Sequence, residues 1–270
     1  MDATLGDFMQ LTRKITVDRG FACASYKEKC LRRRVAVRMR ARGVHTYDDY
    51  ARLLDRDAGE YDRLLDALTI NVTKLFRNWE AYAALATQVV PELWARDTPS
   101  IRVWSAGCSS GHEPHSLAIL FHRHAADTGM LRQLERVHVL GTDIDRTCLA
   151  AGQRGEYVEA DFADTPPDLR ERYFTATPPF TVSPAIREMV RFERRDLLTT
   201  RPAARSYDLL VCRNVLIYFD RDTQLRLFDL FSETLAPGGY LMLGKVETLL
   251  GSCRTRFTAI DARERIFIRR

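Results

Sequence analysis

The spacing of apolar residues changes near Pro99, and this change restricts the fold more than any other feature of the sequence. Beyond Pro99, short apolar runs alternate with amphipathic stretches, the order expected for a parallel sheet with helices on both faces. The strands predicted here cover residues 101–106, 137–141, 207–212 and 240–243. Helices are predicted over 114–126 and 223–235, and two further strand-like runs, 257–260 and 265–268, flank a turn at 262–264. This part is therefore predicted to be an α/β domain.

Before Pro99 the apolar residues recur at helical intervals instead. Phe8, Leu11 and Ile15 share one face of a helix at this spacing, and similar stripes continue to Leu68. A further helix is predicted over 78–95. Residues 1–70 are therefore predicted to form a small all-α unit ahead of the α/β domain.

One predicted helix of the all-α unit is strongly basic. Between Lys27 and Arg42 there are eight basic residues and a single acid, whereas the formal net charge of the whole chain is +5. Ser25 and Glu28 match a capping box at the start of this helix, and Gly43 is suited to its end. Its apolar stripe, which would face a core, consists of Leu31, Val35 and Met39.

The arginines of this helix form either an ordinary solvated surface or a docking surface for an acidic partner. Such a partner would be a nucleic acid or a protein rich in Asp and Glu. No aromatic side chains alternate with the arginines, so stacking on single-stranded bases is disfavoured. Charge alone does not choose between these partners.

Composition excludes several classes of protein. The chain is 46% hydrophobic and 29% charged, so it can bury a core. It lacks an apolar run of the ~18–20 residues that span a bilayer, and its first residues lack the pattern of a secretory signal. Six cysteines occur without a CxxC pair. This usage indicates a reduced cytoplasmic protein, without membrane insertion, rather than a disulfide or zinc scaffold.

Residues 106–115, at the end of the first predicted strand, partly match the motifs of three kinds of site: a serine hydrolase, a zinc site and a cofactor-binding loop. Ser109 lies in a G-x-S-x-G string, but no histidine follows His138, as a hydrolase triad of this order requires. The run His112–His115 resembles a zinc-binding HExxH motif that is one residue short and interrupted by a proline. Small residues at the end of a parallel strand also let backbone N–H groups approach a cofactor at a helix N-terminus.

Two other stretches favour the cofactor interpretation. Asp143 ends the second predicted strand, where a carboxylate can accept hydrogen bonds from the ribose of a nucleoside cofactor. The glycine spacing is not that of a dinucleotide site, so NAD is disfavoured. Together with the run at 235–241, L-A-P-G-G-Y-L, these features indicate an S-adenosylmethionine-dependent methyltransferase.

Four strings carry a resemblance to a known family. They are N-V-T-K-L-F-R at 71–77, W-S-A-G-C-S-S-G at 104–111, T-D-I-D at 142–145 and C-R-N-V-L-I-Y-F at 212–219. With the basic helix, they make the chain similar, nearly from end to end, to the chemoreceptor (chemotaxis) glutamate O-methyltransferases of the CheR type. The resemblance implies an α/β fold, a Rossmann-like class I methyltransferase domain with a small β-subdomain, preceded by an all-α domain. The implied parts are an arginine-rich receptor-docking domain (1–70), a linker and helix closing over the cofactor (71–98), and the methyltransferase domain (99–270, with the β-subdomain at about 175–194).

The resemblance also implies a reaction and the residues for it. The cofactor would be S-adenosylmethionine, with S-adenosylhomocysteine as product, and the substrate would be glutamate side chains on the cytoplasmic helices of a chemoreceptor or similar acidic protein, so nucleic acid is disfavoured. Catalytic roles fall to Arg77, Arg213 and Tyr218. Cofactor contacts fall to Asn71, Thr73, Arg77, Ala106, Gly107, Glu113, Asp143, Asp196, Leu197, Cys212 and Arg213. Substrate docking falls to Arg32, Arg33, Arg34, Arg38, Arg40 and Arg42.

Elementary chemistry agrees with this assignment. A glutamate with a pKa of about 4.3 is ionised at neutral pH, so its carboxylate needs no general base. The enzyme has to orient that carboxylate and remove its water. Arg77 and Tyr218 are suited to the task because they donate hydrogen bonds without taking a proton.

The chain departs from the family pattern at several places, one of them Asp196, where the family often has asparagine. His112 and His115 replace an acid and a tyrosine, so cofactor affinity is expected to depend on pH. Lys245 replaces a histidine, and the following valine replaces a serine. The stretch 174–184 lacks glycine, so docking of a receptor's C-terminal peptide there is not expected. Two alternatives stay open: a regulatory protein that binds S-adenosylmethionine without turnover, and a methyltransferase for an acidic protein outside chemotaxis.

Overall fold

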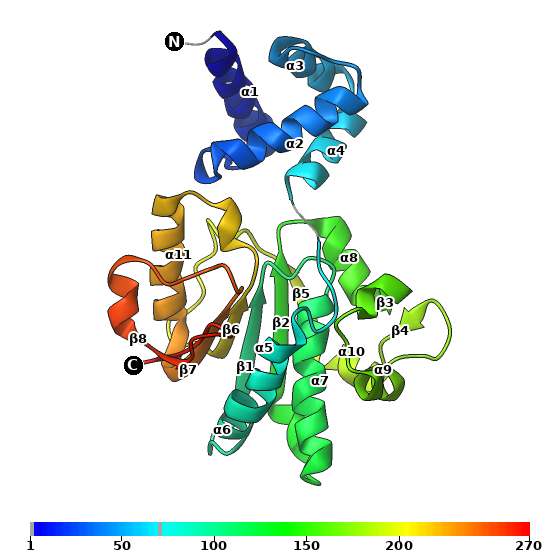
Figure 1. Cartoon of the computed structure of the whole chain (residues 1–270), viewed down its shortest axis with the longest axis vertical. Coiled ribbons are helices and arrows are strands. Elements are labelled where there is room, and N and C mark those ends of the chain that lie inside the picture. Colours follow the sequence, from blue (N-terminus) through cyan, green and yellow to red (C-terminus); the bar gives the residue numbers. More distant parts are fainter. Residues whose placement is uncertain (1–2, 70–71) are drawn as a thin grey trace. The chain divides into compact units, whose positions relative to one another are not determined.

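The computed structural model describes residues 3–69 and 72–270, and its elements fall into two compact units (Figure 1). The first unit comprises Met1–Ile70 together with the short segment Tyr218–Thr223, and the second comprises Asn71–Ile217 and Gln224–Arg270. Within the described ranges, no helix is both long enough and apolar enough to cross a bilayer.

The first unit is all-α, as predicted. Its helices are α1 (Ala3–Arg19), α2 (Glu28–Ala41), α3 (Tyr47–Arg56) and α4 (Ala58–Leu68), with a 3-10 turn, η1, at Cys23–Ser25. Leu31, Val35 and Met39 of the basic helix α2 are buried, as the apolar stripe predicted. They share one hydrophobic core with residues of the other three helices.

The predicted C-terminal end of α2 is confirmed, whereas its predicted N-terminal cap is wrong. The helix begins at Glu28, and the side chain of Lys27, the residue before it, makes no capping hydrogen bond. The capping box predicted from Ser25 and Glu28 is therefore wrong, because Ser25 lies in the 3-10 turn η1 and not next to the first residue of the helix. The end of the helix is as predicted: Gly43 has a φ of +64°, the left-handed conformation that suits glycine after a last helical turn.

The segment Tyr218–Thr223 belongs to the first unit through contacts with the η1 region. The backbone N–H of Lys27 donates to the carbonyl of Tyr218 (2.9 Å), and that of Asp220 donates to the carbonyl of Ser25 (3.0 Å). The rings of Tyr26 and Phe219 lie 4.8 Å apart between centroids. The string at 212–219 is therefore divided between the two units.

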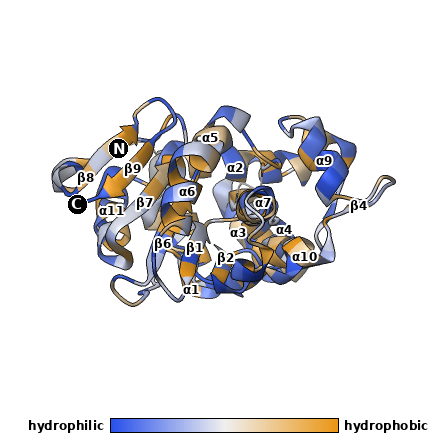
Figure 2. Cartoon of the chain, turned by 90° about the horizontal axis from the view of Figure 1, so that it is seen from below, coloured by the Kyte–Doolittle hydropathy of each residue, from blue (hydrophilic) through white to orange (hydrophobic). Residues whose placement is uncertain are grey.

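The second unit is built on a seven-stranded sheet of order β5-β2-β1-β6-β7-β9-β8. The strands are β1 (Ile101–Ala106), β2 (Val137–Asp143), β5 (Val190–Arg194), β6 (Tyr207–Cys212), β7 (Leu235–Leu243), β8 (Phe257–Asp261) and β9 (Ile266–Arg269). The pairs from β5 to β7 are parallel, and β9 pairs antiparallel with β7 and β8. Each predicted strand overlaps one of these, and hydrophobic residues gather along the sheet (Figure 2). The predicted α/β fold is confirmed.

The expected β-subdomain at 175–194 has different boundaries. Val190–Arg194 is β5, an edge strand of the main sheet that pairs with β2. A separate two-stranded sheet joins β3 (Glu156–Tyr157) to β4 (Phe180–Thr181), so the small sheet uses residues well before 175. A strand of two residues carries no period in the sequence, which is why β3 was missed.

The helices of the second unit partly follow prediction. They are α5 (Trp79–Ala84), α6 (Val90–Trp94), α7 (His112–Asp127), α8 (Arg146–Arg154), α9 (Pro167–Tyr173), α10 (Pro184–Glu188) and, from Gln224 on, α11 (Arg221–Thr234). The predicted helix 78–95 contains a π-helical turn at Leu85–Val89, between α5 and α6. Pro91 is the second residue after this turn, and its missing N–H explains why the regular bonding pattern changes there.

The strand order reverses at β1. The chain passes from β1 to β2 and β5 on one side, and then to β6 and β7 on the other. In open parallel sheets, ligands bind outside the carboxyl ends of the strands at such a reversal. The loops after β1, β2, β6 and β7 are therefore where a binding site is expected.

Candidate active site

The loop after β1 is shaped by two glycines. Gly107 has φ +78° and Gly111 has φ +83°, both in the left-handed region. A Cβ atom on Gly107 would lie 2.6 Å from a methyl carbon of Val215, and one on Gly111 would lie 2.7 Å from the Cα of Gly152. The loop therefore packs closely against both the loop after β6 and helix α8, and larger residues would push these apart.

Asp143, at the end of β2, faces this loop. Its carboxylate accepts hydrogen bonds from the backbone N–H groups of Ser109 (2.8 Å) and Asp145 (3.0 Å). Burial raises the pKa of Asp143, although these backbone donors oppose the rise. The structure thus places a carboxylate at the carboxyl edge of the sheet, beside the β1 loop.

Glu113, in the first turn of α7, is a buried carboxyl group. The hydroxyl of Ser105 donates to its Oε1 atom (2.8 Å). Burial raises the pKa of Glu113 to about 7, while nearby Arg213 and the bond from Ser105 act in the opposite direction. Among the described residues, no basic side chain lies within 4.0 Å of its carboxylate, so the group is suited to receive a cation.

Arg213 directly follows β6 and is only 6% exposed. Its guanidinium carbon lies 5.3 Å from the centre of the Tyr82 ring. Its Nη2 atom donates to Oδ1 of Asn78 (3.2 Å). Glu113, Tyr82 and Arg213 therefore form one buried polar cluster between α7, α5 and the end of β6.

Glu247 is a site-forming residue that the sequence did not indicate. Its buried carboxylate accepts from four backbone N–H groups, those of Asn214 (3.0 Å), Val215 (3.0 Å), Ile217 (3.3 Å) and Gly244 (2.7 Å). These bonds hold the loop after β6, which carries Arg213, against the end of β7. The available signal was an acid a few residues beyond the end of a parallel strand. Its neighbour Lys245 lies 3.6 Å from Glu80 and 3.7 Å from Glu264.

The described part of the string 71–77 is anchored to the second unit by its backbone. The N–H of Leu75 donates to the carbonyl of Asp161 (3.0 Å), and that of Phe76 donates to the hydroxyl of Ser116 (2.9 Å). Arg77 folds back, and its Nη1 donates to the carbonyl of Val72 (2.8 Å). Thr73 is half-buried in the same stretch, whereas Asn71 lies outside the described residues.

The remaining predicted cofactor residues stand at strand ends. Ala106 and Cys212 are fully buried at the ends of β1 and β6. Asp196 follows β5, where its Oδ1 accepts from the N–H of Leu198 (2.9 Å), and Leu197 is buried. Together with Gly107, Asp143 and Arg213, they line the carboxyl edge of the parallel strands. Tyr218 instead lies in the segment that belongs to the first unit.

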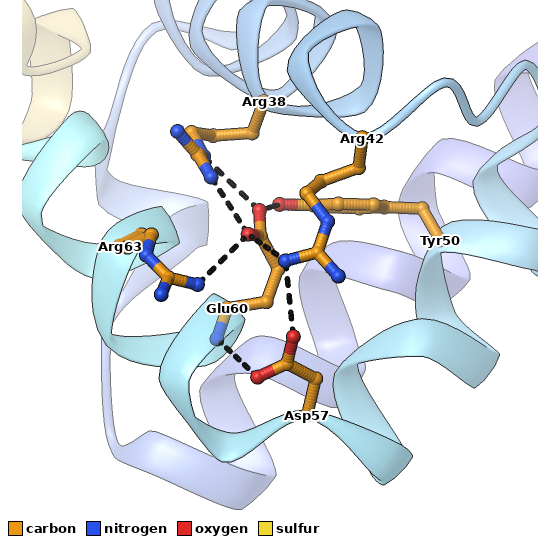
Figure 3. A network of polar contacts seen from close by, with 6 residues as sticks. All are labelled: Arg38, Arg42, Tyr50, Asp57, Glu60 and Arg63. Carbon is orange, nitrogen blue, oxygen red and sulfur yellow. Dashed lines mark hydrogen bonds and ion pairs between the residues drawn. The ribbon is translucent and has the colours of Figure 1, made fainter.

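Part of the positive charge on the basic helix α2 is paired with a buried carboxylate of the first unit. The carboxylate of Glu60, fully buried on α4, accepts two bonds from Arg38 (3.0 and 2.6 Å), one from Arg42 (3.3 Å) and one from the Tyr50 hydroxyl (2.8 Å), and Arg63 lies 3.8 Å away (Figure 3).

Three of the six predicted docking arginines therefore have partners within the first unit. Arg38 and Arg42 hold Glu60, and Arg32 pairs with Glu28 (2.6 Å) and lies over the ring of Phe8. Arg34 is half-buried. Its Nε atom has no hydrogen-bond partner among the described residues. The exposed side of α2, opposite its buried stripe, consists of Lys29, Arg33, Val37 and Arg40.

The two histidines of the altered motif behave differently. His115 is buried against Tyr157, whose hydroxyl it contacts, and burial lowers the pKa of His115 to about 3. It stays neutral at physiological pH, so the expected contribution of His115 to pH dependence is wrong. His112 lies 3.2 Å from the carboxylate of Asp161. Among the described residues, no group of three or more His, Cys, Asp or Glu side chains is arranged to hold a metal ion. The hydroxyl of Ser109 lies 3.9 Å from the thiol of Cys148.

These side chains fit S-adenosylmethionine. Its ammonium group needs an anionic acceptor, for which the buried carboxyl of Glu113 is suited, and its ribose hydroxyls need acceptors, for which the carboxylate of Asp143 is suited. The glycines leave the loop after β1 without side chains that would fill the same space. The fold and the site together define an α/β methyltransferase with an adenosylmethionine site at the reversal of strand order.

Comparison with known proteins identifies the family. Residues 71–266 match the family described as "CheR methyltransferase, SAM binding domain", and residues 6–69 match "CheR methyltransferase, all-alpha domain". The chain is 34% identical over 245 residues to a chemotaxis protein methyltransferase of Listeria monocytogenes, covering 90% of each chain. It is 32% identical over 255 residues to chemotaxis protein methyltransferase 1 of Pseudomonas aeruginosa, covering 92% of each. The chain belongs to the CheR methyltransferase family and is an S-adenosylmethionine-dependent methyltransferase.

Proposed function

We propose that this enzyme methylates glutamate side chains on the cytoplasmic helices of a chemoreceptor, and that it acts in the cytoplasm. The observation that carries the proposal is the buried cluster of Glu113 and Arg213, in which the carboxylate of Glu113 has no ion-pair partner among the described residues. The acid suits a cationic cofactor, and the guanidinium suits an anionic acceptor of the methyl group. Relatives named chemotaxis protein methyltransferases support the same substrate class.

The chain's own residues have three tasks in this reaction. Glu113 and Asp143 bind and orient the cofactor, which when bound supplies a methyl group whose bond to sulfur breaks as S-adenosylhomocysteine is released. Arg213 and Arg77 orient the substrate carboxylate, whose oxygen forms the new bond to the methyl carbon. No proton has to be removed, because the carboxylate is already ionised. Tyr218 donates a further hydrogen bond to that carboxylate, and exclusion of water favours the combination of opposite charges.

Docking on the substrate falls to the exposed side of α2. Lys29, Arg33 and Arg40 are exposed there and have no acidic partner among the described residues. Arg38 and Arg42 are committed to Glu60, so they contribute to the shape of the unit more than to the contact. A helical protein rich in Asp and Glu complements this row of charges, and steering by such charges weakens with salt.

The test is methyl transfer from labelled S-adenosylmethionine to a purified cytoplasmic receptor fragment. Alkali should release the label as methanol, because a carboxyl methyl ester hydrolyses whereas methyl groups on nitrogen stay bound. The label should disappear when the acceptor glutamates of the fragment are changed to glutamine.

Two other results would redirect the proposal. Binding of S-adenosylmethionine by calorimetry without any labelled receptor, whatever the fragment, would favour a regulatory protein. Base-labile label on a different acidic protein, with none on the receptor, would place the enzyme outside chemotaxis.

A further inference from the structure

Asn78 stands directly after the string 71–77 and has an unusual backbone. Its φ is +58° and its ψ is 73°, a left-handed conformation, at the start of helix α5. Its N–H donates to the carboxylate of Asp164 (2.8 Å), and its carbonyl accepts from the N–H of Ala81 (2.9 Å). Asparagine tolerates this conformation better than other residues with side chains. The backbone of Asn78 is therefore fixed on both sides.

The side chain of Asn78 meets the buried guanidinium of Arg213. The distance from Arg213 Nη2 to Asn78 Oδ1 is 3.2 Å. A buried guanidinium needs acceptors for its donors, and the Nε atom of Arg213 has none among the described residues. The ring of Tyr82 limits the guanidinium on one face. Loss of the Asn78 oxygen would thus leave Arg213 free to turn away.

Asn78 also connects three stretches of chain that are distant in sequence. Through its backbone it joins the end of the string 71–77 to Asp164, and through its side chain it joins that string to the end of β6. Asn78 therefore links the end of the string directly to the guanidinium of Arg213.

We propose that Asn78 is a positioning residue that holds Arg213 in its cofactor-facing and substrate-facing orientation. It touches neither reactant in this proposal and acts through Arg213. The inference rests on the role proposed above for Arg213, and it assigns to Asn78 a function beyond helix capping.

The decisive variant is Asn78→Gly. Glycine adopts a positive φ without strain, so this change removes the acceptor oxygen while keeping the backbone conformation. The matched control is Arg205→Gly, since Arg205 is an exposed residue that also has a left-handed backbone (φ +56°). Asn78→Asp keeps both the acceptor and a tolerated left-handed residue, and it serves as the rescue variant.

Binding of S-adenosylhomocysteine by calorimetry and thermal unfolding of the free protein are the two measurements. Loss of a hydrogen bond to a charged group should weaken binding in Asn78→Gly about tenfold. Its Tm should fall somewhat below that of Arg205→Gly, because the buried guanidinium loses an acceptor, but the protein should stay folded at the temperature of the binding measurement. Arg205→Gly should bind like the unmodified protein. Asn78→Asp should recover most of the affinity. In turnover, kcat should fall together with kcat/KM, because a turned Arg213 misplaces the acceptor.

Two results would overturn the proposal. One is an Asn78→Gly protein whose affinity stays within about twofold of the unmodified enzyme. The other is an Asn78→Asp protein as weak as Asn78→Gly, which would make the role a matter of local structure alone. Failure of the unmodified enzyme to methylate a receptor fragment would refute the proposed substrate, whereas the binding series would still decide the role of Asn78.

Discussion

Burial of the Glu113 carboxyl group disfavours its ionised form in the free protein, and a bound cation would favour that form. Folding raises its pKa from the usual 4.5 to about 7, chiefly through burial. Between these two pH values the folded protein binds more protons than the unfolded chain, so this group makes the free protein less stable as pH rises. An ammonium group beside the carboxylate favours the ionised form. Cofactor binding should therefore strengthen as pH rises through about 7.

Glu113→Gln tests this argument. The amide keeps an acceptor for Ser105 but carries no charge, so S-adenosylhomocysteine should bind about tenfold more weakly at pH 8. The increase of affinity with pH should also become flatter, whereas the Tm of the free protein should not fall. Calorimetry over about pH 6 to 8 measures both effects. Glu156→Gln, at an exposed carboxyl, is the control, and an unchanged pH profile in Glu113→Gln would contradict the assignment.

At the scale of elements, α2 has two basic faces with different tasks. Arg38 and Arg42 neutralise the buried carboxylate of Glu60 (Figure 3), whereas Arg33 and Arg40 point away from the core. Removing a partner from a buried carboxylate is costly because its charge is left without compensation. Removing an exposed charge costs little stability but weakens attraction to an acidic surface.

Reversing the exposed charges should separate these two tasks. Arg33→Glu combined with Arg40→Glu should raise the KM for an acidic receptor fragment about tenfold at low salt, with little change in Tm. Arg38→Ala should instead cost about 1–3 kcal/mol of stability. Initial rates at several salt concentrations, together with thermal unfolding, distinguish the variants. Equal effects of both variants on KM would argue against a docking role confined to the exposed side.

The bounds of some strands could be predicted from the sequence, whereas the partners of buried charged side chains could not. The strands β1 and β6 have the predicted bounds, because four of the six residues or more are buried in each and leave a mostly apolar run in the sequence. The partners of charged residues could not be predicted, since Glu60 and Glu247 meet theirs only after chain folding brings distant segments together. The same limit explains why Asp143 was recognised as a site residue by its position alone, whereas Glu247 was not.

At the scale of the whole molecule, the two units share one string of sequence. Arg213 belongs to the second unit, but Tyr218, five residues later, belongs to the first. The first unit holds that segment through the backbone of Lys27 and the ring of Tyr26, which contacts Phe219. Under the catalytic role proposed above for Tyr218, a residue of the helical unit influences turnover by holding this segment.

Tyr26→Ala should expose this dependence. Loss of the ring that packs on Phe219 loosens the segment Tyr218–Thr223, so kcat should fall about tenfold while the affinity for S-adenosylhomocysteine stays unchanged. Leu53→Ala is the control, because Leu53 is also a half-buried side chain of the first unit's core but lies on α3, outside the η1 region that holds the segment. Both variants should lose similar thermal stability, and only Tyr26→Ala should lose turnover. Equal kcat values in the two variants would contradict the prediction. They would mean that turnover does not depend on the contact between Tyr26 and the segment that carries Tyr218.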